Sequence, residues 1–486
     1  MKKQHLLKAF AALAIAVLVA SCSKDDNLSG DEGGFDPTKN EIAMPKREIR
    51  AAWIATVYNL DWPTTKSNAD AQKNELKELL QASKAMNFNA VILQIRPMAD
   101  ALYASNLEPW SSVLTGTQGT DPGYDPLAFA VEEAHKLGLQ LHAWMNPYRI
   151  GSTSAVLAQS HVAVKNPSWV VTFNGTKYFN PGIPEVRAHL IAVVKDVITR
   201  YKVDAIHFDD YFYPSGAKAT DPFVFDDKSA FEKYGNGLTI TQWREQNVNT
   251  MVREVYTAIK STKPSVAFGI SPAGVRDNSL ALYADPLVWL ENKWVDYLAP
   301  QVYWEIGHAT ADFAKQAAYW STNAKGIPMI IGIAAYKYKD SKYPAYGTVE
   351  EFGKEIDEVR KYTNLFGEFF YRAKNLLASD LSTYLKTKYP TMAIPPVFGN
   401  PTAPIATAPE VALAGSTLSW KAVASAEKYV TYVLTPTAGK QNSYQASIAQ
   451  IGTELSVKVE SGKIYVVSAL NADNVESAKS KYITVP

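Results

Sequence analysis

Two adjacent carboxylates, Asp209 and Asp210, stand directly after a short apolar run and beside two rings, His207 and Tyr211. A third acidic side chain, Glu305, follows another apolar run. Cleavage of a glycosidic bond requires a neutral carboxyl group that protonates the leaving oxygen and an ionised one that attacks the sugar or activates water. These residues therefore predict a paired-carboxylate hydrolase site. In it, Asp209 is the expected nucleophile or base, Glu305 the expected general acid, and Asp210 a modulator or the true nucleophile.

The acidic pair also has other interpretations. An Asp-Asp pair at the end of a strand can cap a helix or bind Mg²⁺ or Ca²⁺. The chain contains neither the His-Glu-x-x-His motif of zinc proteases nor the Gly-x-Ser-x-Gly elbow of serine hydrolases. Its single cysteine, Cys22, excludes a disulfide framework and a cysteine-based zinc cluster. We therefore expect catalysis without a bound metal or cofactor.

Alternation along the strands predicts which side chains share the face of these carboxylates, because successive residues of a strand point to opposite faces. Ile206 and Phe208 are apolar and should face outward, which turns His207 and Asp209 inward. Other apolar runs add an inward set made of Gln94, Arg96, His142, Trp144, Asn146, Gln301, Tyr303 and Glu305. Aromatic faces stack on sugar rings, and amide and guanidinium groups bond sugar hydroxyls. The set therefore favours a polysaccharide as the ligand.

Eight apolar runs of strand length alternate with helical stretches and would position these side chains. The expected strands are residues 48–56, 90–97, 139–147, 205–212, 267–274, 296–304, 329–336 and 365–372. Alternating strands and helices build a parallel sheet, and eight such units predict an α/β fold, a (β/α)₈ TIM barrel with its active site at the carboxyl ends of the strands. A doubly wound open sheet is the competing fold. It should carry a glycine-rich turn after the first strand, where this chain has YNLDWPTT.

The overall composition agrees with a large folded protein. The chain has 486 residues, of which 47% are hydrophobic and 12% aromatic, enough for one large core and an appended domain. Lys and Arg total 49 and Asp and Glu total 48, so the formal net charge is +1. This balance excludes a polyanion-binding surface over the whole protein, and we expect no nucleic-acid partner.

The composition changes after residue 390. Residues 391–402 are rich in proline and predict a linker between the barrel over residues 46–390 and a second domain. Residues 403–486 contain short alternating runs separated by turn residues, which predict a β-sandwich. With Trp420 and Tyr429 in its second and third strands, this region resembles a fibronectin type III domain, and another all-β sandwich is the alternative.

The start of the chain carries targeting signals. Residues 1–21 join a charged start to the apolar run AFAALAIAVLVA, which is too short for a stable membrane span and is typical of a signal peptide. The residues up to Cys22 resemble the bacterial lipobox, in which the cysteine is lipidated and becomes the first mature residue. Residues 22–45 are polar and Gly-rich and predict a flexible tether. We therefore expect a membrane-anchored lipoprotein of the cell envelope, on the outer membrane, facing the periplasm or the surface.

Six blocks of the chain, in order from about residue 46 to residue 385, resemble the glycosyl hydrolase-like family 10. They are REIRAAWIATVYNLDWP, FNAVILQIRPMADALYASNLEPWS, GYDPLAFAVEEAHKLGLQLHAWMNPYR, DAIHFDDYFYP, FGISPAGV and DYLAPQVYW. The resemblance implies a (β/α)₈ barrel, glycosidase activity and an envelope setting, and some members of the family cleave peptidoglycan glycan strands that lack peptides. By this resemblance, the family's acidic pair corresponds to Asp209 and Asp210 in the block HFDDYFYP. The family's substrate-side polar groups correspond to Trp144, Asn146, Tyr148 and Arg149 in the block LHAWMNPYR.

One block departs from the family, because the usual GVWRN is GVRDN here and lacks the tryptophan. Asp277 in that block becomes an alternative acid. The full set of expected substrate-binding residues is Arg96, His142, Trp144, Asn146, Tyr148, Arg149, His207, Tyr211, Gln301, Tyr303 and Trp304. Orienting Asp209 is an equal alternative for His142 and His207. Both retention and inversion at the anomeric carbon are compatible with this set.

These observations predict a lipid-anchored glycoside hydrolase that cleaves O-glycosidic bonds in a polysaccharide, with peptidoglycan glycan strands as the leading substrate. A hydrolase of host or dietary polysaccharide is one alternative. A non-catalytic glycan-binding lipoprotein of the envelope, which would keep the barrel as a scaffold, is another.

Overall fold

The computed structural model describes residues 35–377, 380–399 and 401–486, and its larger part is a closed barrel of eight parallel strands. The barrel strands are β2 (Ile49–Ile54), β3 (Ala90–Arg96), β4 (Gln140–Met145), β8 (Ala205–Phe208), β9 (Ala267–Ile270), β10 (Tyr297–Leu298), β11 (Met329–Ile333) and β12 (Leu365–Phe370). All eight expected strands are present, so the predicted α/β TIM barrel is confirmed. The expected signal peptide, Cys22 and the expected tether up to residue 34 lie outside the described residues.

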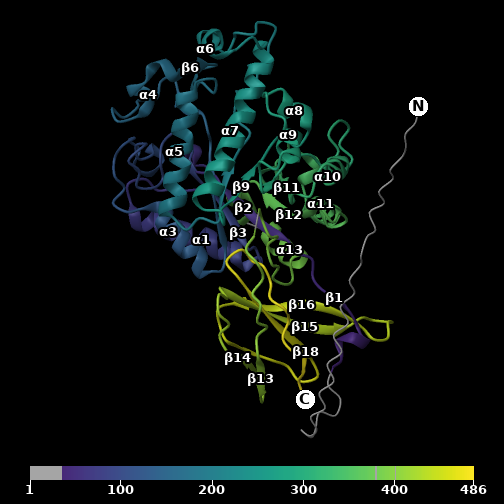
Figure 1. Ribbon diagram of the computed structural model, residues 1–486. Coiled ribbons are helices and arrows are strands. Elements are labelled where there is room, and N and C mark those ends of the chain that lie inside the picture. The colour runs from purple at the N-terminus through teal and green to yellow at the C-terminus, as the bar shows by residue number, and fades with distance from the viewer. Residues whose placement is uncertain (1–34, 378–379, 400) are drawn as a thin grey trace, which may run out of the picture.

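Helices surround the barrel (Figure 1). They are α1 (Ala69–Ala85), α2 (Ser112–Thr115), α3 (Pro126–Lys136), α4 (Val162–Lys165), α5 (Pro184–Arg200), α6 (Lys228–Tyr234), α7 (Ile240–Thr262), α8 (Arg276–Leu280), α9 (Pro286–Glu291), α10 (Phe313–Thr322), α11 (Glu350–Arg360), α12 (Ala373–Leu377) and α13 (Asp380–Lys388). Short 3₁₀ helices are η1 (Pro37–Lys39), η2 (Val57–Asn59), η3 (Pro167–Trp169), η4 (Ala335–Lys337) and η5 (Pro344–Tyr346). Over the described part of the chain, no helix is long and apolar enough to cross a membrane.

The loop after β4 is enlarged into a small antiparallel sheet of β5 (Arg149–Ser152), β7 (Thr176–Phe179) and β6 (Val170–Phe173), in that spatial order. Enlarged loops at the carboxyl ends of barrel strands are where enzymes of this architecture build their binding surfaces. This sheet therefore extends one side of the barrel mouth.

The barrel strands sort their side chains into two apolar clusters. Leu93 and Phe208 belong to the outer cluster, which packs against helix residues such as Leu76 of α1. Ile92 and Trp144 belong to the inner cluster, which fills the barrel. The expected alternation of inward and outward residues is therefore confirmed along these strands, because each side chain buries its apolar surface on one side of the sheet.

The C-terminal region forms two facing sheets. The smaller sheet contains β13 (Val411–Ala414), β14 (Thr417–Trp420) and β17 (Ser456–Lys458). The larger contains β1 (Glu41–Ala43), β16 (Ser443–Gly452), β15 (Lys428–Pro436), β18 (Ile464–Leu470) and β19 (Ile483–Thr484). The rings of Trp420 and Tyr429 lie 5.6 Å apart in the core between the two sheets. The fibronectin type III assignment stays a prediction.

The described end of the expected tether is structured. Strand β1 pairs in parallel with β16, so that Glu41 lies opposite Ser443. The Phe35 ring packs edge-on against Tyr444, with ring centroids 4.9 Å apart. The expectation of a flexible tether through residue 45 is therefore wrong for residues 35–45, because the exposed edge of β16 supplies hydrogen-bond partners for this segment.

The Pro-rich linker is docked rather than extended. The Asn89 side-chain amide donates to the Ala393 carbonyl at 2.9 Å, and the Glu48 N–H donates to the Ile394 carbonyl at 3.0 Å. Further along, the Phe398 ring lies 4.9 Å from that of Tyr297 and packs against the inner cluster of the barrel. The linker thus closes the end of the barrel at which the strands begin, and Figure 1 shows the sandwich below that end.

We predict that Phe398→Ala lowers the free energy of unfolding by about 2 kcal/mol, because it removes a half-buried ring from the base of the barrel. Chemical denaturation of the full chain measures this change. Val156→Ala is the matched control, since Val156 is 91% exposed and its truncation should change stability by less than about 0.5 kcal/mol. Equal stability of the two variants would show that the linker does not brace the barrel.

Candidate active site

Asp209 lies just beyond β8, at the end of the barrel where the strands finish, and is 3% exposed. The Trp144 indole N–H donates to its Oδ2 at 3.1 Å, and the Asn146 amide donates to both of its oxygens at 3.1 Å. Burial raises the pKa of Asp209, while the charge of Arg149 and these hydrogen bonds oppose that rise. Because its partners are N–H donors, the arrangement favours the ionised carboxylate.

Asp210 is held differently from its neighbour. It is only partly buried, and the Gln301 amide donates to its Oδ1 at 3.1 Å. Burial and, second, the charge of Asp209 raise the pKa of Asp210 to about 7. Two carboxyl groups this close do not both ionise readily, so one proton is retained by the pair. Since Asp209 has the stronger set of N–H donors, Asp210 is the member that keeps the proton near neutral pH.

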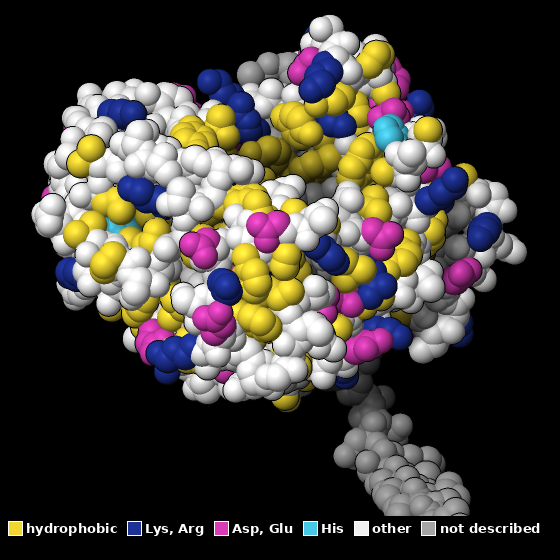
Figure 2. Space-filling model, turned by 90° about the horizontal axis from the view of Figure 1, so that it is seen from above, with side chains coloured by type: hydrophobic (Ala, Val, Ile, Leu, Met, Phe, Trp, Pro, Cys, Tyr) yellow, Lys and Arg dark blue, Asp and Glu magenta, His cyan; other side chains and the backbone are white. Residues whose placement is uncertain are grey.

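Tyrosine and tryptophan rings form the wall next to the pair. The Tyr303 ring stacks on Tyr371 at 6.0 Å with an interplanar angle of 22°, and Tyr336 meets Tyr303 edge-on at 5.8 Å. Trp53 lies 6.2 Å from Tyr371. Figure 2 looks onto this end of the barrel and shows a hollow in which hydrophobic side chains gather. The mouth therefore offers flat apolar surfaces to a sugar ring.

Three of these rings were missed from sequence. The prediction assigned Tyr303 to the mouth, but it made no facing assignment for the first and eighth strands or for the loop after the seventh, which carry Trp53, Tyr371 and Tyr336. The alternation of apolar residues in 48–56 was the available signal for Trp53. Tyr371 follows the last residue of β12, where alternation no longer gives a direction.

Arg149 and Tyr211 do lie at the mouth, as predicted. The Arg149 guanidinium carbon lies 5.5 Å from the centre of the Tyr211 ring, and Arg149 also donates to the Pro97 carbonyl at 3.3 Å. Tyr211 is 49% exposed and Tyr58, on η2 after β2, is 70% exposed. Exposed rings at a site entrance are suited to hold successive sugars of a chain.

His142 and His207 are not at the surface of the site. Both are fully buried inside the barrel, and their Nδ1 atoms lie 2.9 and 3.0 Å from the Tyr297 hydroxyl oxygen. Burial lowers the pKa of His142 to about 4 and the pKa of His207 well below its usual value, so both rings are neutral. The Trp53 indole N–H donates to His207 Nε2 at 3.3 Å, which places the His207 proton on Nδ1. The predicted substrate contact by these histidines is therefore wrong, because both rings bond within the barrel core.

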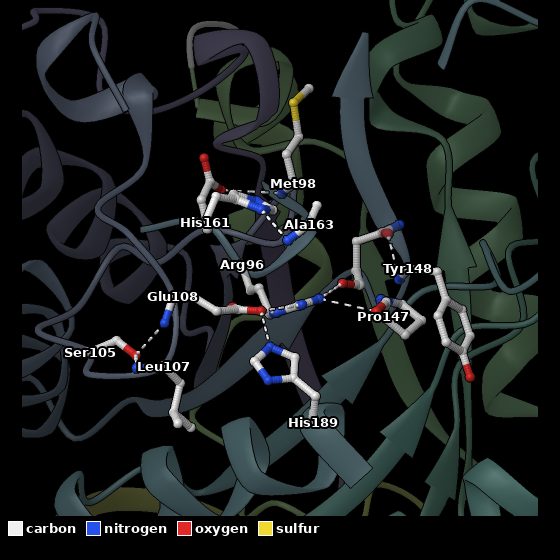
Figure 3. Close-up of polar contacts among 12 residues, drawn as sticks. Arg96, Met98, Ser105, Leu107, Glu108, Pro147, Tyr148, His161, Ala163 and His189 are labelled. Atoms are coloured by element: carbon white, nitrogen blue, oxygen red, sulfur yellow. Dashed lines mark hydrogen bonds and ion pairs between the residues drawn. The ribbon is translucent and has the colours of Figure 1, made fainter. Parts of the chain in front are cut away.

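Arg96 is likewise a structural residue rather than a substrate contact. The side chains of Arg96 and Glu108 are both 0% exposed and form an ion pair, with Arg96 Nε donating to Glu108 Oε2 at 2.7 Å. Burial opposes ionisation of Glu108, but the charge of Arg96 overcomes it and lowers the pKa of Glu108 to about 2. Figure 3 shows Arg96 between Glu108 and Pro147, with His189 of α5 against Glu108. The pairing of β3 with β4 shifts register between Gln94 and Arg96, so simple alternation does not apply to Arg96.

Asn146 and Tyr148 have structural partners as well. Asn146 is fully buried, and besides holding Asp209 it accepts the Arg149 backbone N–H at 2.8 Å. Arg96 donates to the Asn146 backbone carbonyl, so the buried ion pair supports this loop. Tyr148 is 0% exposed and belongs to the outer cluster. The predicted substrate contact is wrong for both residues, and Asn146 acts instead by positioning Asp209.

Glu305 is partly buried in the loop after β10. Burial lowers the pKa of Lys337, and the charge of Glu305 opposes that change. Lys337 in turn donates to the Tyr303 backbone carbonyl. Trp304 lies 6.3 Å from the His308 ring in the loop that leads to α10. Asp277, the alternative acid, is exposed on the first turn of α8.

A parallel eight-stranded barrel whose carboxyl end carries an acidic pair among aromatic rings is an arrangement suited to glycoside hydrolysis. The sequence profile of the glycosyl hydrolase-like 10 family matches residues 48–345, and this chain belongs to that family. It is 40% identical over 376 residues to the glycosyl hydrolase YngK of Bacillus subtilis, a match that covers 71% of this chain and 73% of YngK. It is 32% identical over 417 residues to the glycosyl hydrolase DigH of Escherichia coli K12, covering 76% of this chain and 93% of DigH.

Among solved structures, the glycoside hydrolase domain of PgaB (BpsB) from Bordetella bronchiseptica aligns with 70% of this chain and 98% of its own. The identity is 12% and the TM-score is 0.47, a likeness too distant to support an inference about chemistry. Family membership, together with the fold, identifies the chain as a glycosidase that acts on a polysaccharide.

We predict that Arg96→Met lowers the free energy of unfolding by about 3–5 kcal/mol, because it leaves the Glu108 carboxylate buried without its partner. Urea denaturation followed by circular dichroism gives this value. The double variant Arg96→Met/Glu108→Leu should recover most of the loss, since no buried charge then remains unpaired. A single variant as stable as the parent would contradict the support role of the pair.

Proposed function

We propose that this glycosidase cleaves peptidoglycan glycan strands in the cell envelope, with Asp210 as the general acid. The family resemblance supports the substrate, because some members of the family cleave such strands. The lipobox-like residues before Cys22 support the setting, because a lipid anchor would keep the enzyme on a membrane next to its polymer.

The protonation of the acidic pair is the observation that carries the catalytic assignment. An acid that donates to a leaving oxygen must hold a proton at working pH, and the pKa of about 7 meets this need for Asp210. Asp209 keeps the proton on Asp210 through its own buried charge. Gln301 fixes the direction of the Asp210 carboxyl group. Asp210 therefore takes the role of general acid that the sequence analysis gave to Glu305.

We predict that Asp210→Asn reduces kcat/KM on peptide-free glycan strands by at least about 100-fold, because the leaving oxygen loses its proton donor. In the parent, burial and the Asp209 charge raise the pKa of Asp210 to about 7 and thereby favour the protonated acid. The protonated fraction falls above that pH, so kcat/KM should decline by about tenfold per pH unit on the alkaline side. Reducing-end release across a pH series measures both effects.

Glu305→Gln is the control for this assignment and should keep most of the activity of the parent. If Glu305→Gln lost activity while Asp210→Asn stayed active, Glu305 would be the general acid instead of Asp210. If the enzyme cleaved a plant or host polysaccharide and left peptidoglycan strands uncut, peptidoglycan would be rejected as the substrate. The assignment as a glycosidase would then stand.

The anchor is a separate proposal with its own prediction. Cys22→Ser should move the protein from the membrane fraction to the soluble fraction of the envelope, because a serine cannot carry the thioether-linked lipid. Ser23→Ala is the matched control and should stay with the membrane. Protease treatment of intact cells then reports whether the barrel faces the surface or the periplasm. A Cys22→Ser protein that stays in the membrane fraction would reject the lipid anchor.

A further inference from the structure

A cavity of about 470 Å³ lies between the base of the barrel and the sandwich, at the opposite end of the barrel from the acidic pair. The barrel lines it with the end of α1 and the loop before β4, the docked linker with residues 392–395, and the sandwich with parts of β15 and β16. Figure 1 shows the two domains meeting at this end. A cavity of this volume can hold a ligand of one or two sugar rings.

Two lysines, one from each domain, line this cavity. Lys84 stands in the last turn of α1, Lys428 is the first residue of β15, and both are half-buried. Among the residues that the structure describes, neither ammonium group has a hydrogen-bond or ion-pair partner. Burial and, second, the charge of Lys428 lower the pKa of Lys84. Two ammonium groups that share a cavity repel each other, and a bound anion would relieve this repulsion.

Other half-buried lysines at this end of the barrel do have partners. Lys260 pairs with Asp296 at 2.5 Å. Lys263 donates to the backbone carbonyls of Ile198 and Tyr201 at 3.3 and 3.2 Å. The chain therefore supplies acceptors for these two ammonium groups, whereas Lys84 is left with its donors unused.

The end of α1 does not account for Lys84 either. The backbone carbonyl of Lys84 accepts the Asn87 N–H at 2.9 Å, so a backbone donor closes this turn of the chain. The Lys84 Nζ atom lies 3.7 Å from the point that a Cβ would occupy at Gly138, in the loop before β4. The ammonium group thus reaches a neighbouring loop that lines the same cavity.

The other charged side chains of the cavity are already bonded. Glu454 accepts from the Gln450 amide at 3.2 Å, and its carboxylate lies over Gly452 of its own segment. The exposed His135 and Lys136 have acidic partners, Asp204 at 2.9 Å and Glu132 at 2.6 Å. In this cavity, as far as the structure describes it, the charges without a partner are therefore positive.

The remaining lining suits a saccharide. The half-buried side-chain amides of Asn87 and Asn474 line the cavity, and amides both donate to hydroxyl groups and accept from them. Met392 and Ile451, also half-buried, add apolar surface that the C–H face of a sugar ring can cover. Inorganic phosphate would use the lysines and leave these groups without a role.

We propose that this cavity binds a carboxylated saccharide as a second, non-catalytic site, with Lys84 and Lys428 holding the carboxylate. The proposal rests on the proposed function, because the polymer assigned there supplies such a group. Removal of the peptide from a muramic acid residue frees its lactyl carboxylate, whereas the same carbon is an amide in a strand that carries peptides. The cavity would therefore favour glycan strands that lack peptides.

The test measures binding to the full chain by isothermal titration calorimetry. The ligand is the disaccharide of N-acetylglucosamine and N-acetylmuramic acid, and its neutral counterpart has the lactyl carboxylate converted to a methylamide. The parent should bind the acid at least about tenfold more tightly than the methylamide, because the amide cannot form charge-assisted hydrogen bonds with both lysines. This comparison needs no protein variant.

The variants locate the site. Lys84→Gln/Lys428→Gln should bind the acid at least about tenfold more weakly than the parent and should bind the methylamide as the parent does. Lys386→Gln/Lys440→Gln is the matched control, since both lysines are exposed and neither lines the cavity. It should bind both ligands like the parent. The circular dichroism of all variants should match that of the parent.

Equal affinity of the parent for the acid and the methylamide would overturn the proposal, and so would unchanged binding of the acid by Lys84→Gln/Lys428→Gln. Binding of inorganic phosphate through the two lysines, without binding of the disaccharide, would overturn it in favour of a phosphate site. Reducing-end release from peptide-free strands tests the proposed function separately. A parent that cleaves these strands without binding the acid at the cavity would refute the second site alone, and a parent that leaves them uncut would reject the proposed function.

Discussion

The buried negative charge of Asp209 is the interaction on which the rest of the site depends. A carboxylate that is 3% exposed is stable in ionised form only if donors surround it, and Trp144 and Asn146 supply them. The charge in turn raises the pKa of Asp210 into the neutral range, which makes the second carboxyl group an acid. Much of the surrounding structure can be understood as support for this pair.

That support includes a buried ion pair at the end of β3. Arg96 and Glu108 pair in the outer layer with no exposure to solvent, and Arg96 bonds the carbonyl of Asn146. His189 of α5 joins the same carboxylate at 3.0 Å. A buried pair of this kind stabilises little by itself but costs much when broken. Its effect is to hold the loop after β4 in one arrangement, so that the Asn146 amide meets Asp209.

The interior of the barrel is filled by polar rings that satisfy one another. Trp53 donates to His207, and the Tyr297 hydroxyl lies between His207 and His142. From the sequence alone, the inward histidines were expected to contact the substrate. Here their ring nitrogens are used within the core, and the docked Phe398 closes the base beneath them. The polar side chains at the mouth, at the opposite end of the barrel, are carboxylates, amides and tyrosines.

The sequence by itself determined the eight strands, their inward and outward faces and the acidic pair, because these follow from local periodicity and from residue types. It placed Arg149, Tyr211, Gln301 and Tyr303 at the mouth. Only the tertiary structure decided the places of Arg96, Tyr148 and Glu305. Arg96 follows a register shift between β3 and β4, and the other two lie beyond the strand ends, where alternation no longer applies. The tertiary structure also decided which carboxyl group keeps a proton. That depends on burial, on the charge of the neighbouring carboxylate, and on hydrogen-bond donors from β4 and from the loop after β10.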